Sequence, residues 1–361
     1  MQTMRYLNQL EPDALVDAFM QQPPRDFNAW TLADSTPVFS AEFNLLTTLE
    51  PEVCRTITGW PCYKLWGEWL KPYTCFVGTT VTEYVLIPAQ VNPKAWIANI
   101  KTVLASKYSF LIIKDLPQVS PLLSQQENQA AAAAIAAAQQ AGFVMVEGQA
   151  LAWVPIDFAT VDDYMARLSS VTRKSLRRKL KARDNLNITS IATGDYYFHD
   201  NAVVADFYQL YVSVFEQSDI HFDMLTLDFF SAVLRSSDSG GVVMMYRHAG
   251  QLVGYNICFV TGNKLLDKYV GFRYPAAREH NLYFVSWFVN LQYALAHKLT
   301  HYVAGWTDPQ VKKSLGAQFV FTSHAVHVRN PLIRNLLRPF KSLFERDSKV
   351  IERKPWVDAH E

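Results

Sequence analysis

The sequence predicts an α/β fold, because segments with strand character alternate with segments with helix character along most of the chain. The clearest example runs from Lys264 to Thr307. There KLLDKYVGF indicates a strand, YPAAREHN a polar loop, LYFVSWFVNLQYALAHKL a buried helix and THYVAGWT a second strand. Such a unit requires two parallel strands joined by a right-handed crossover.

The first half of the chain shows the same alternation after a loop-rich start, residues 1–50, with one short helix. TCFVGTTVTEYVLIPAQ indicates strands, and PKAWIANIKTVLASK has apolar residues at helical spacing. YSFLIIKDLP, ended by Pro117, has the character of a buried parallel strand. The alanine-rich SQQENQAAAAAIAAAQQAG predicts a helix ending at Gly142, and FVMVEG and ALAWVPI predict two further strands.

The second half begins with a long helix, TVDDYMARLSSVTRKSLRRKLKAR, followed by the strand NLNITSIAT and two helices around FYQLYVSVF and LDFFSAVL. GGVVMMYRHAGQLVGYNICFVTG predicts a hairpin, and the strand–helix–strand unit comes next. A short helix, DPQVKKSLGAQ, and a strand, FTSHAVHVRN, complete the pattern. We expect an N-terminal domain at residues 1–156, a C-terminal domain at 157–345 and a polar tail at 346–361.

Composition and charge exclude several classes of protein. A formal charge of +1 gives no overall reason to expect nucleic acid as partner, so any such claim depends on local charge. The first residues lack the pattern of a secretory signal, and we expect a cytoplasmic protein. The four cysteines have no CxxC spacing, so neither a zinc site nor any other metal is expected.

From about residue 157 to 330, this order of elements resembles the GNAT superfamily of acyl-CoA N-acyltransferases, and within it the Fem-type transferases with two GNAT-like halves in tandem. The segments that carry the resemblance are DDYMARLSSVTRKSLRRKLK, FYQLYVSVF, LDFFSAVL, GQLVGY, LDKYVGF, LYFVSWFVNLQYALAHKL and KKSLGAQF. The resemblance implies two tandem GNAT-like domains with mixed sheets flanked by helices, the first degenerate. It also implies transfer of an acyl group to a primary amine, from acyl-CoA, an acyl-carrier protein or an aminoacyl-tRNA.

The loop before the buried helix departs from the GNAT pattern. GNAT enzymes place a glycine-rich turn there, which holds the pyrophosphate of coenzyme A. In this chain the corresponding segment is RYPAAREHNLYF, without glycine. Because glycine allows the closest approach of backbone N–H groups to phosphate, the departure argues against ordinary acetyl-CoA as donor.

Candidate catalytic residues lie on the strand LLDKYVGF. Alternation of side chains predicts Asp267 and Tyr269 on one face and Lys268 on the other. Acyl transfer to an amine needs a group that accepts a proton and a group that protonates the leaving thiolate or hydroxyl. Asp267 and Tyr269 could serve, although an aspartate at a strand edge is often only salt-bridged or solvated.

Candidate contacts to the donor's phosphate lie where helices start, because helix N-termini favour anions. Asparagine and aspartate are also favoured as N-caps, which gives Asn281 and Asp308 a structural alternative. The candidate phosphate contacts are Arg278, His280, Asn281, Lys312 and Lys313.

A basic helix, expected at residues 165–183, carries the strongest local charge. Seven of the eleven residues from Arg173 to Arg183 are Arg or Lys, among them Arg177 and Arg178, and no acid follows them at i+4 spacing. Unbalanced charge of this density favours a phosphate-bearing partner such as tRNA, coenzyme A or an anionic headgroup. A solvated helix face is the alternative.

Three further segments carry weaker signals. SDIHFDM could bind the acceptor amine through Asp219, His221 and Asp223. The aromatic segment GWPCYKLWGEWLKPY is expected to pack beneath a loop, with a ligand platform as the minority interpretation. The amphipathic, basic residues 331–345 predict either docking on the protein body or peripheral contact with the inner face of an anionic membrane.

Two functions follow from these patterns. The first is an N-acyltransferase that moves an acyl or aminoacyl group from a thioester or tRNA ester to a primary amine. The alternative is a non-catalytic binding module on a decayed GNAT fold, which holds a phosphate-bearing or membrane partner through its basic helix.

Overall fold

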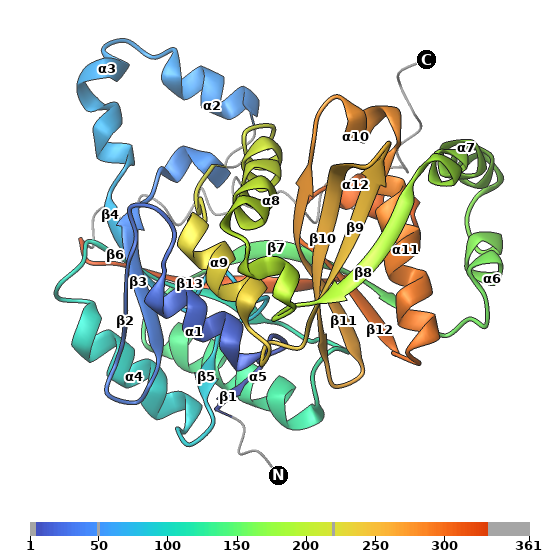
Figure 1. Cartoon of the computed structure of the whole chain (residues 1–361). Helices are drawn as coiled ribbons and strands as arrows, with labels where there is room; N and C mark the ends of the chain where they lie inside the picture. The colour runs from blue at the N-terminus through green and yellow to red at the C-terminus, as the bar shows by residue number, and fades with distance from the viewer. Residues whose placement is uncertain (1–4, 49–50, 219–220, 331–361) are drawn as a thin grey trace. The chain divides into compact units, whose positions relative to one another are not determined.

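A computed structural model describes residues 5–48, 51–218 and 221–330 (Figure 1). Contacts divide these residues into two compact units. The first unit comprises residues 5–10, 19–150 and 320–330, and the second comprises residues 11–18 and 151–319. The expected domain limits at residues 156 and 345 stay a prediction.

The sheet of the first unit has the strand order β2-β3-β4-β6-β13-β7. Its pairs β2–β3, β3–β4 and β6–β13 are antiparallel, whereas β4 and β6 are parallel, as expected for YSFLIIKDLP. The strands are β2 (Asn28–Thr31), β3 (Pro37–Glu42), β4 (Tyr73–Val77), β6 (Phe110–Pro117), β7 (Val144–Pro155) and β13 (Gln318–Val328), with a separate pair β1 (Tyr6–Leu7) and β5 (Ile87–Pro88).

Helices α4 (Pro93–Leu104) and α5 (Gln125–Gln140) pack against each other in this unit (Figure 1). The Asn92 side chain accepts a hydrogen bond from the Lys94 N–H at the start of α4, and Ser124 forms a capping box with Glu127 on α5. Alanines spaced three and four apart form the buried face of α5, which lets the two helices approach closely. Gly142 follows α5 with φ 84°, as expected for a helix end.

Strand β7 corrects the expectation of two strands, FVMVEG and ALAWVPI, because it continues from Val144 to Pro155. Gly148 lies inside it, where an added Cβ would come within 2.1 Å of the Thr322 hydroxyl oxygen. The glycine therefore permits a close approach between neighbouring strands rather than ending one.

Short helical elements fill the connection from β3 to β4. They are η1 (Leu45–Thr48), α2 (Pro51–Thr58), α3 (Tyr63–Trp66) and η2 (Gly67–Leu70). The last two lie within the aromatic segment GWPCYKLWGEWLKPY, for which the sequence predicted packing beneath a loop.

The second unit has the strand order β7-β12-β11-β10-β9-β8, in which β11 and β12 are the parallel pair. The predicted hairpin is present as β9 and β10, and its turn contains Ala249 at φ 46° and Gly250 at φ 82°. The strands are β8 (Asn187–Ala192), β9 (Gly241–His248), β10 (Gln251–Thr261), β11 (Lys264–Phe272) and β12 (His301–Gly305).

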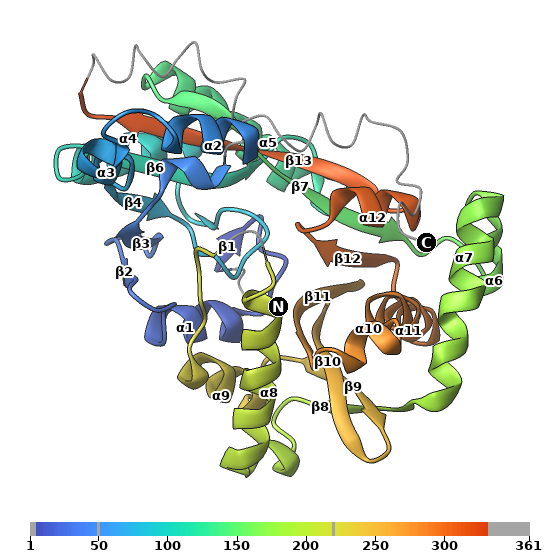
Figure 2. The same cartoon turned by 90° about the horizontal axis from the view of Figure 1, so that it is seen from above.

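Helices cover both faces of this second sheet. Figure 2 shows α8 (Asn201–Phe215) and α9 (Leu227–Arg235) on one face of β9–β11 and α11 (Leu282–Ala296) on the other. Helix α11 is buried nearly all round, as its uniformly apolar sequence predicts. The short helical elements of the unit include η4 (Tyr196–His199), α10 (Ala276–Glu279) and α12 (Pro309–Ser314).

The expected long basic helix is wrong in its extent, because residues 160–185 form three pieces. They are α6 (Val161–Ala166), α7 (Ser170–Leu180) and the 3-10 turn η3 (Lys181–Asn185). The Ser169 side chain accepts the Thr172 N–H, which starts α7 as a separate helix. The charge is therefore concentrated in α7 and η3.

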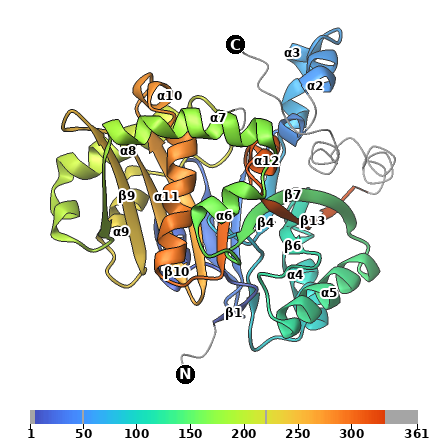
Figure 3. The same cartoon turned by 90° about the vertical axis from the view of Figure 1, so that its right-hand side faces the viewer.

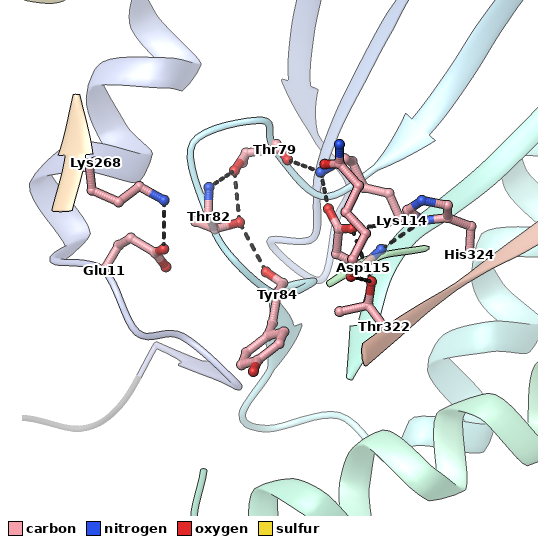
Figure 4. A network of polar contacts seen from close by, with 10 residues as sticks. Glu11, Thr79, Thr82, Tyr84, Lys114, Asp115, Lys268, Thr322 and His324 are labelled. Atoms are coloured by element: carbon pink, nitrogen blue, oxygen red, sulfur yellow. Dashed lines mark hydrogen bonds and ion pairs between the residues drawn. The ribbon is translucent and has the colours of Figure 1, made fainter. Parts of the chain in front are cut away.

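Residues 11–18 belong to the second unit although they lie near the start of the chain. Helix α1 (Asp13–Gln21) begins there, and Glu11 precedes it. The Lys268 ammonium of β11 lies 3.1 Å from a Glu11 carboxylate oxygen, and both side chains are buried (Figure 4). This ion pair is one contact that joins the segment to β11.

Candidate functional site

Parallel strands β11 and β12 stay together for only three residue pairs. Register pairs run from Lys264↔His301 to Leu266↔Val303, whereas β11 continues to Phe272. From Asp267 onward, the edge of β11 that faced β12 is therefore no longer paired with it. Backbone N–H and C=O groups on such an edge can bind the amides of an extended ligand.

A β-bulge lies at the same point and reverses the expected alternation. Ile257 is paired with Tyr269, and the next residue of β10, Cys258, is paired with Asp267, so Lys268 is the extra residue. Because consecutive residues of β10 face opposite sides, Asp267 and Tyr269 do too. The expectation that both side chains share one face was wrong.

Asp267 faces α11 and is surrounded by hydrogen-bond donors. Its carboxylate accepts from the amides of Asn256 at 3.0 and 3.1 Å and of Asn290 at 2.9 Å, and from the hydroxyl of Tyr302 at 3.0 Å. Burial raises the pKa of Asp267, although these hydrogen bonds and the charge of Lys312 act in the opposite direction. The network ties β10, β11, β12 and α11 together where the strands part.

Tyr269 lies on the other face, among aromatic rings. Its ring contacts those of Phe229 and Phe230 of α9, at centroid distances of 5.8 and 5.7 Å. Its surroundings are those of a core residue, and a joint action with Asp267 on one substrate face has no geometric support.

A pocket of about 280 Å³ lies at the start of α11, in the loop that the sequence singled out. The first N–H groups of a helix generally lack an acceptor within the helix, although the Phe284 N–H already donates to the Asn281 carbonyl at 3.0 Å. The residues that line it are Phe272, Tyr274, Ala277, Arg278, Asn281, Tyr283 and Phe284.

Left-handed backbone replaces the missing glycine in this loop. Asn281 has φ 49° directly before α11, and its side chain makes no capping hydrogen bond. Asp308 before α12 behaves in the same way, with φ 54° and no capping bond. Both N-cap alternatives are therefore corrected, because a cap needs extended backbone that turns the side chain toward the helix N–H groups. Asparagine tolerates the left-handed conformation better than most residues.

Tyr283 is a candidate that the sequence patterns missed. Its hydroxyl is buried and has no hydrogen-bond partner among the described residues, and its ring lines the pocket. Burial, with the charges of Asp308 and Asp267, raises the pKa of Tyr283 well above its usual value. Its position in the sequence carried no signal, because a tyrosine in an apolar helix suggests core packing.

The other predicted loop residues have partners of their own. Arg278 is exposed, donates to the Gln217 side-chain oxygen at 2.7 Å and lies 5.1 Å from the centroid of the Tyr274 ring. The His280 ring lies 4.3 Å from that of His248. Burial and His248 lower the pKa of His280, so its neutral form is favoured. Arg278 thus contributes the positive charge at the pocket.

The basic helix α7 crosses the start of α11 (Figure 3). The Lys179 ammonium lies 3.9 Å from the centroid of the Phe284 ring, and Phe284 lines the pocket. Arg177 and Arg178 are exposed, and within the described parts of the chain neither forms an ion pair. The structure therefore brings α7 and the loop together, a proximity that no local pattern in the sequence encodes.

Lys312 and Lys313 differ in environment. Lys312 is buried, and its ammonium donates to the Ala304 carbonyl at 2.6 Å and favours the charged form of Asp267. Lys313 is half-buried. Contact with a donor phosphate stays a prediction for both, and Lys312 would need to leave its carbonyl to make it.

The predicted acceptor site is only partly described. Asp219 lies outside the described residues. His221 folds back on α8, with a ring nitrogen 2.9 Å from the Phe215 carbonyl oxygen, and the backbone oxygen of Asp223 accepts the Tyr211 hydroxyl at 3.5 Å. These contacts hold the segment on its own helix, and an acceptor role stays a prediction.

Neither a metal-binding cluster nor a membrane-spanning helix occurs in the described residues. Those residues contain no group of three or more side chains suited to a metal ion. None of the helices among them is long and apolar enough to cross a membrane. Residues 331–345, the predicted peripheral segment, lie outside the described residues.

Comparison with known proteins gives one matching family and several similar structures. The model of the FemAB-like family, described as peptidoglycan biosynthesis/recognition, matches residues 100–352. No curated protein matched the chain.

Three solved structures are similar over almost their whole length. L-PGS from Bacillus licheniformis has a TM-score of 0.54 at 10% identity, and the match covers 94% of this chain and 98% of that one. The C-terminal domain of a putative lysylphosphatidylglycerol synthetase from Agrobacterium fabrum has a TM-score of 0.53 at 11% identity, and the match covers 94% of this chain and 96% of that one. FemX has a TM-score of 0.52 at 11% identity, and the match covers 92% of this chain and 96% of that one. At these identities the likeness concerns the fold, and it confirms the predicted mixed α/β, GNAT-like fold of the Fem type.

Proposed function

Since the chain belongs to the FemAB-like family, we propose that it is an N-acyltransferase that moves an acyl or aminoacyl group to a primary amine. The donor would be an acyl thioester or an aminoacyl-tRNA, both of which carry phosphate. The description of the family makes an amine of a peptidoglycan precursor the first acceptor to test.

Two observations together carry this proposal: β11 and β12 part at Asp267, and the pocket at the start of α11 lies further along β11, where Phe272 lines it. An extended donor could pair with the open edge of β11 while its phosphates meet the first amides of α11. Arg278 and the basic α7 supply positive charge next to that position.

The reaction requires three events at the donor's carbonyl. The amine nitrogen forms a bond to the carbonyl carbon, and N–H groups on the open edge of β11 stabilise the oxyanion that develops. The carbon–sulfur or carbon–oxygen bond to the leaving group then breaks. The nitrogen gives up a proton as the amide forms, and the leaving thiolate or ribose alkoxide takes one up. The buried hydroxyl of Tyr283 is our candidate donor, and the proton released by the nitrogen restores it.

For Asp267 we propose a positioning role. Amide and hydroxyl donors from three side chains, with the Cys258 thiol at 3.6 Å, already occupy its oxygens, which leaves little room for a substrate amine. The carboxylate instead fixes the bulge and hence the direction of the open edge of β11. Proton acceptance by Asp267 or Tyr269 stays a prediction, and the bulge prevents the two from acting on one substrate face.

Titration calorimetry of the full chain against coenzyme A, a long-chain acyl-CoA and bulk tRNA tests the proposal. We expect one of the three to bind, and Arg278→Glu to weaken that binding about tenfold, because one cation is replaced by an anion next to phosphate. Arg25→Glu is the matched control, since Arg25 is an exposed arginine in the first unit. Absence of binding by all three ligands would remove the basis of the proposal.

The binding-module alternative is favoured by one observation, the glycine-free loop that contains the short helix α10. It predicts that a ligand binds while no acyl group is transferred. Incubation of the chain with the bound donor and a panel of amines, followed by mass spectrometry of the amines, separates the two functions.

A further inference from the structure

An arm of the first unit, residues 54–72, exposes large apolar side chains. It contains the end of α2, the short helix α3 and the 3-10 turn η2. Figure 1 shows α2 and α3 standing out beyond the strands β3 and β4 that they connect. The expectation that this segment packs beneath a loop was wrong.

The exposure is highest at three side chains. Trp60 is 55% exposed, Leu65 79% and Trp69 82%. Every residue of α3 is at least partly exposed. A few exposed apolar residues are normal, but two tryptophans and a leucine with this exposure within ten positions of the chain indicate a partner.

The arm is ordered by its own contacts. The Trp66 ring makes a T-shaped contact with Tyr63 at 5.1 Å, and its indole N–H donates to the Pro61 carbonyl at 3.1 Å. Gly67 is buried against Tyr63, where a Cβ would lie 2.8 Å from the ring. Trp66 therefore supports the arm, while Trp60 and Trp69 expose much of their surface to solvent.

The same segment, residues 54–72, carries exposed positive charge. Arg55 and Lys64 are exposed, and neither forms an ion pair with any residue that the structure describes. Lys71 pairs with Glu68 at 2.9 Å, so this acid is already compensated. The arm thus combines exposed indole rings with exposed cations.

We propose that this arm docks on an anionic lipid bilayer. Tryptophan is enriched at the level of the lipid headgroups, where its ring is apolar and its N–H stays hydrated. Arginine and lysine beside it are attracted to the negative surface of the bilayer. A stable protein interface takes about 20–30 residues a side, more than this arm presents, whereas a fluid bilayer needs no complementary shape.

The apolar rings and the cations are needed together. A small apolar insertion binds a bilayer only weakly and reversibly, and a basic patch strengthens it. The arm holds both within one short segment, separate in sequence from residues 331–345. Docking by this arm is independent of the proposed transfer reaction.

Vesicle flotation of the full chain tests it, with vesicles of equal parts phosphatidylglycerol and phosphatidylcholine compared with phosphatidylcholine alone. We expect binding to the anionic vesicles, and a loss of about tenfold or more in Trp60→Ser/Trp69→Ser, because both insertions are removed. Arg55→Glu/Lys64→Glu should weaken the binding and reduce its dependence on salt. Tyr196→Ser is the control, because Tyr196 is 85% exposed on the other unit.

Thermal unfolding of each variant checks that the fold is kept, which we expect at exposed positions. Quenching of tryptophan fluorescence by brominated lipid gives a second readout of insertion. The proposal is overturned if the chain does not float, if the double tryptophan variant floats like the parent, or if charge reversal has no effect. A concentration-dependent dimer that disappears in the tryptophan variant, without any flotation, would overturn it in favour of a second copy of the chain.

Discussion

Each of the two units contains a pair of parallel strands that separate, and the residues at the point of separation differ between the units. In the first unit, β4 and β6 run parallel from Thr74↔Phe110 to Val77↔Ile113 and then part. In the second, β11 and β12 part after Leu266↔Val303. In both units a charged residue follows the last parallel pair, Lys114 in the first unit and Asp267 in the second. The side chains around that residue determine whether the separated strands form a structural contact or a binding site.

In the first unit, an ion pair and a buried loop lie where β4 and β6 separate. The Lys114 ammonium pairs with the Asp115 carboxylate and donates to the Thr79 carbonyl at 3.0 Å (Figure 4). The Asp115 N–H donates to the ring nitrogen Nδ1 of His324 at 3.0 Å. Thr79 and Thr82 bond to each other within the loop after β4. The polar groups of Thr79, Thr82, Lys114 and Asp115 are therefore engaged in hydrogen bonds or an ion pair.

The second unit surrounds its carboxylate with neutral donors and leaves a pocket further along β11. Asp267 has amide and hydroxyl partners, and Lys312, the nearby cation, is bound to a carbonyl. Equal strand topology therefore does not imply equal function. We expect ligand binding in the second unit and a structural role for the polar cluster of the first.

The largest loss of stability should come from breaking the ion pair of the first unit. Lys114→Met leaves Asp115 buried without its cation, which we expect to lower the free energy of unfolding by about 3 kcal/mol. Urea denaturation measures this loss. Lys114→Met/Asp115→Asn is the control and should recover much of it, because asparagine is neutral and tolerates φ 54°. A loss below about 1 kcal/mol in the single variant would contradict a structural role for the Lys114–Asp115 ion pair.

Removal of the corresponding carboxylate in the second unit should cost less stability and more function. Asp267→Ala leaves three side-chain donors without their acceptor, for an expected loss of about 2 kcal/mol. Ligand binding by calorimetry should fall with it, since the bulge loses its support. Asp228→Ala, at an exposed carboxylate of α9, is the control. Unchanged ligand binding in a folded Asp267→Ala protein would contradict the positioning role of Asp267.

Tyr283→Phe distinguishes catalysis from packing in the pocket. Because the hydroxyl has no partner among the described residues, its removal should change the free energy of unfolding by less than about 1 kcal/mol. The rate of transfer should nevertheless fall about a hundredfold if the hydroxyl protonates the leaving group. Single-turnover kinetics with the donor found by calorimetry provide the measurement. An unchanged rate would show that the proton comes from elsewhere.

The smallest effect is a difference in response to pH. Burial lowers the pKa of His324 below its ordinary 6.5, so the unfolded chain binds more protons as the pH drops through that value, and the first unit loses stability. Burial raises the pKa of Asp267 above 3.8, so between that value and the pKa of the folded state the folded chain binds more protons than the unfolded chain. The second unit therefore loses stability as the pH rises through this range.

Hydrogen exchange read by mass spectrometry can follow both units in one sample. Peptides from β6 and β13 should exchange faster below about pH 6.5 after correction for the intrinsic rate, and His324→Gln should reduce this dependence. His280 and His301, whose pKa values are also lowered, give the second unit some acid sensitivity of its own. An equal response of β13 in His324→Gln and in the parent would rule out His324 as the cause.

Much of the fold could be predicted because local patterns carry it. Apolar spacing indicated α4, α8 and α9, the run ended by Pro117 indicated β6, and the strand–helix–strand unit indicated β11, α11 and β12. The hairpin β2–β3 near the start was missed, since its short strands carry little periodicity. The single long helix at 165–183 was wrong because the cap at Ser169 outweighed a continuous helical pattern.

The candidate site was predicted only in part. The loop with Arg278 and Asn281 and the basic helix were both indicated by charge and position, and the structure places them beside one pocket. Their proximity depends on how α7 crosses α11, which no local pattern encodes. Tyr283 was missed because nothing in the sequence distinguishes an unpartnered hydroxyl from a packed one.

Local sequence decides which segments become strands and helices, because side-chain periodicity, caps and chain breakers act over a few neighbouring residues. Tertiary structure alone decided which face Asp267 presents, since the bulge at Lys268 arises from pairing with β10. It also decided the left-handed turn at Asn281 and the exposure of Trp60 and Trp69. The bulge depends on pairing between residues apart in the chain, and the exposure of a side chain depends on which other parts of the fold cover it. The proposed functions rest on these features.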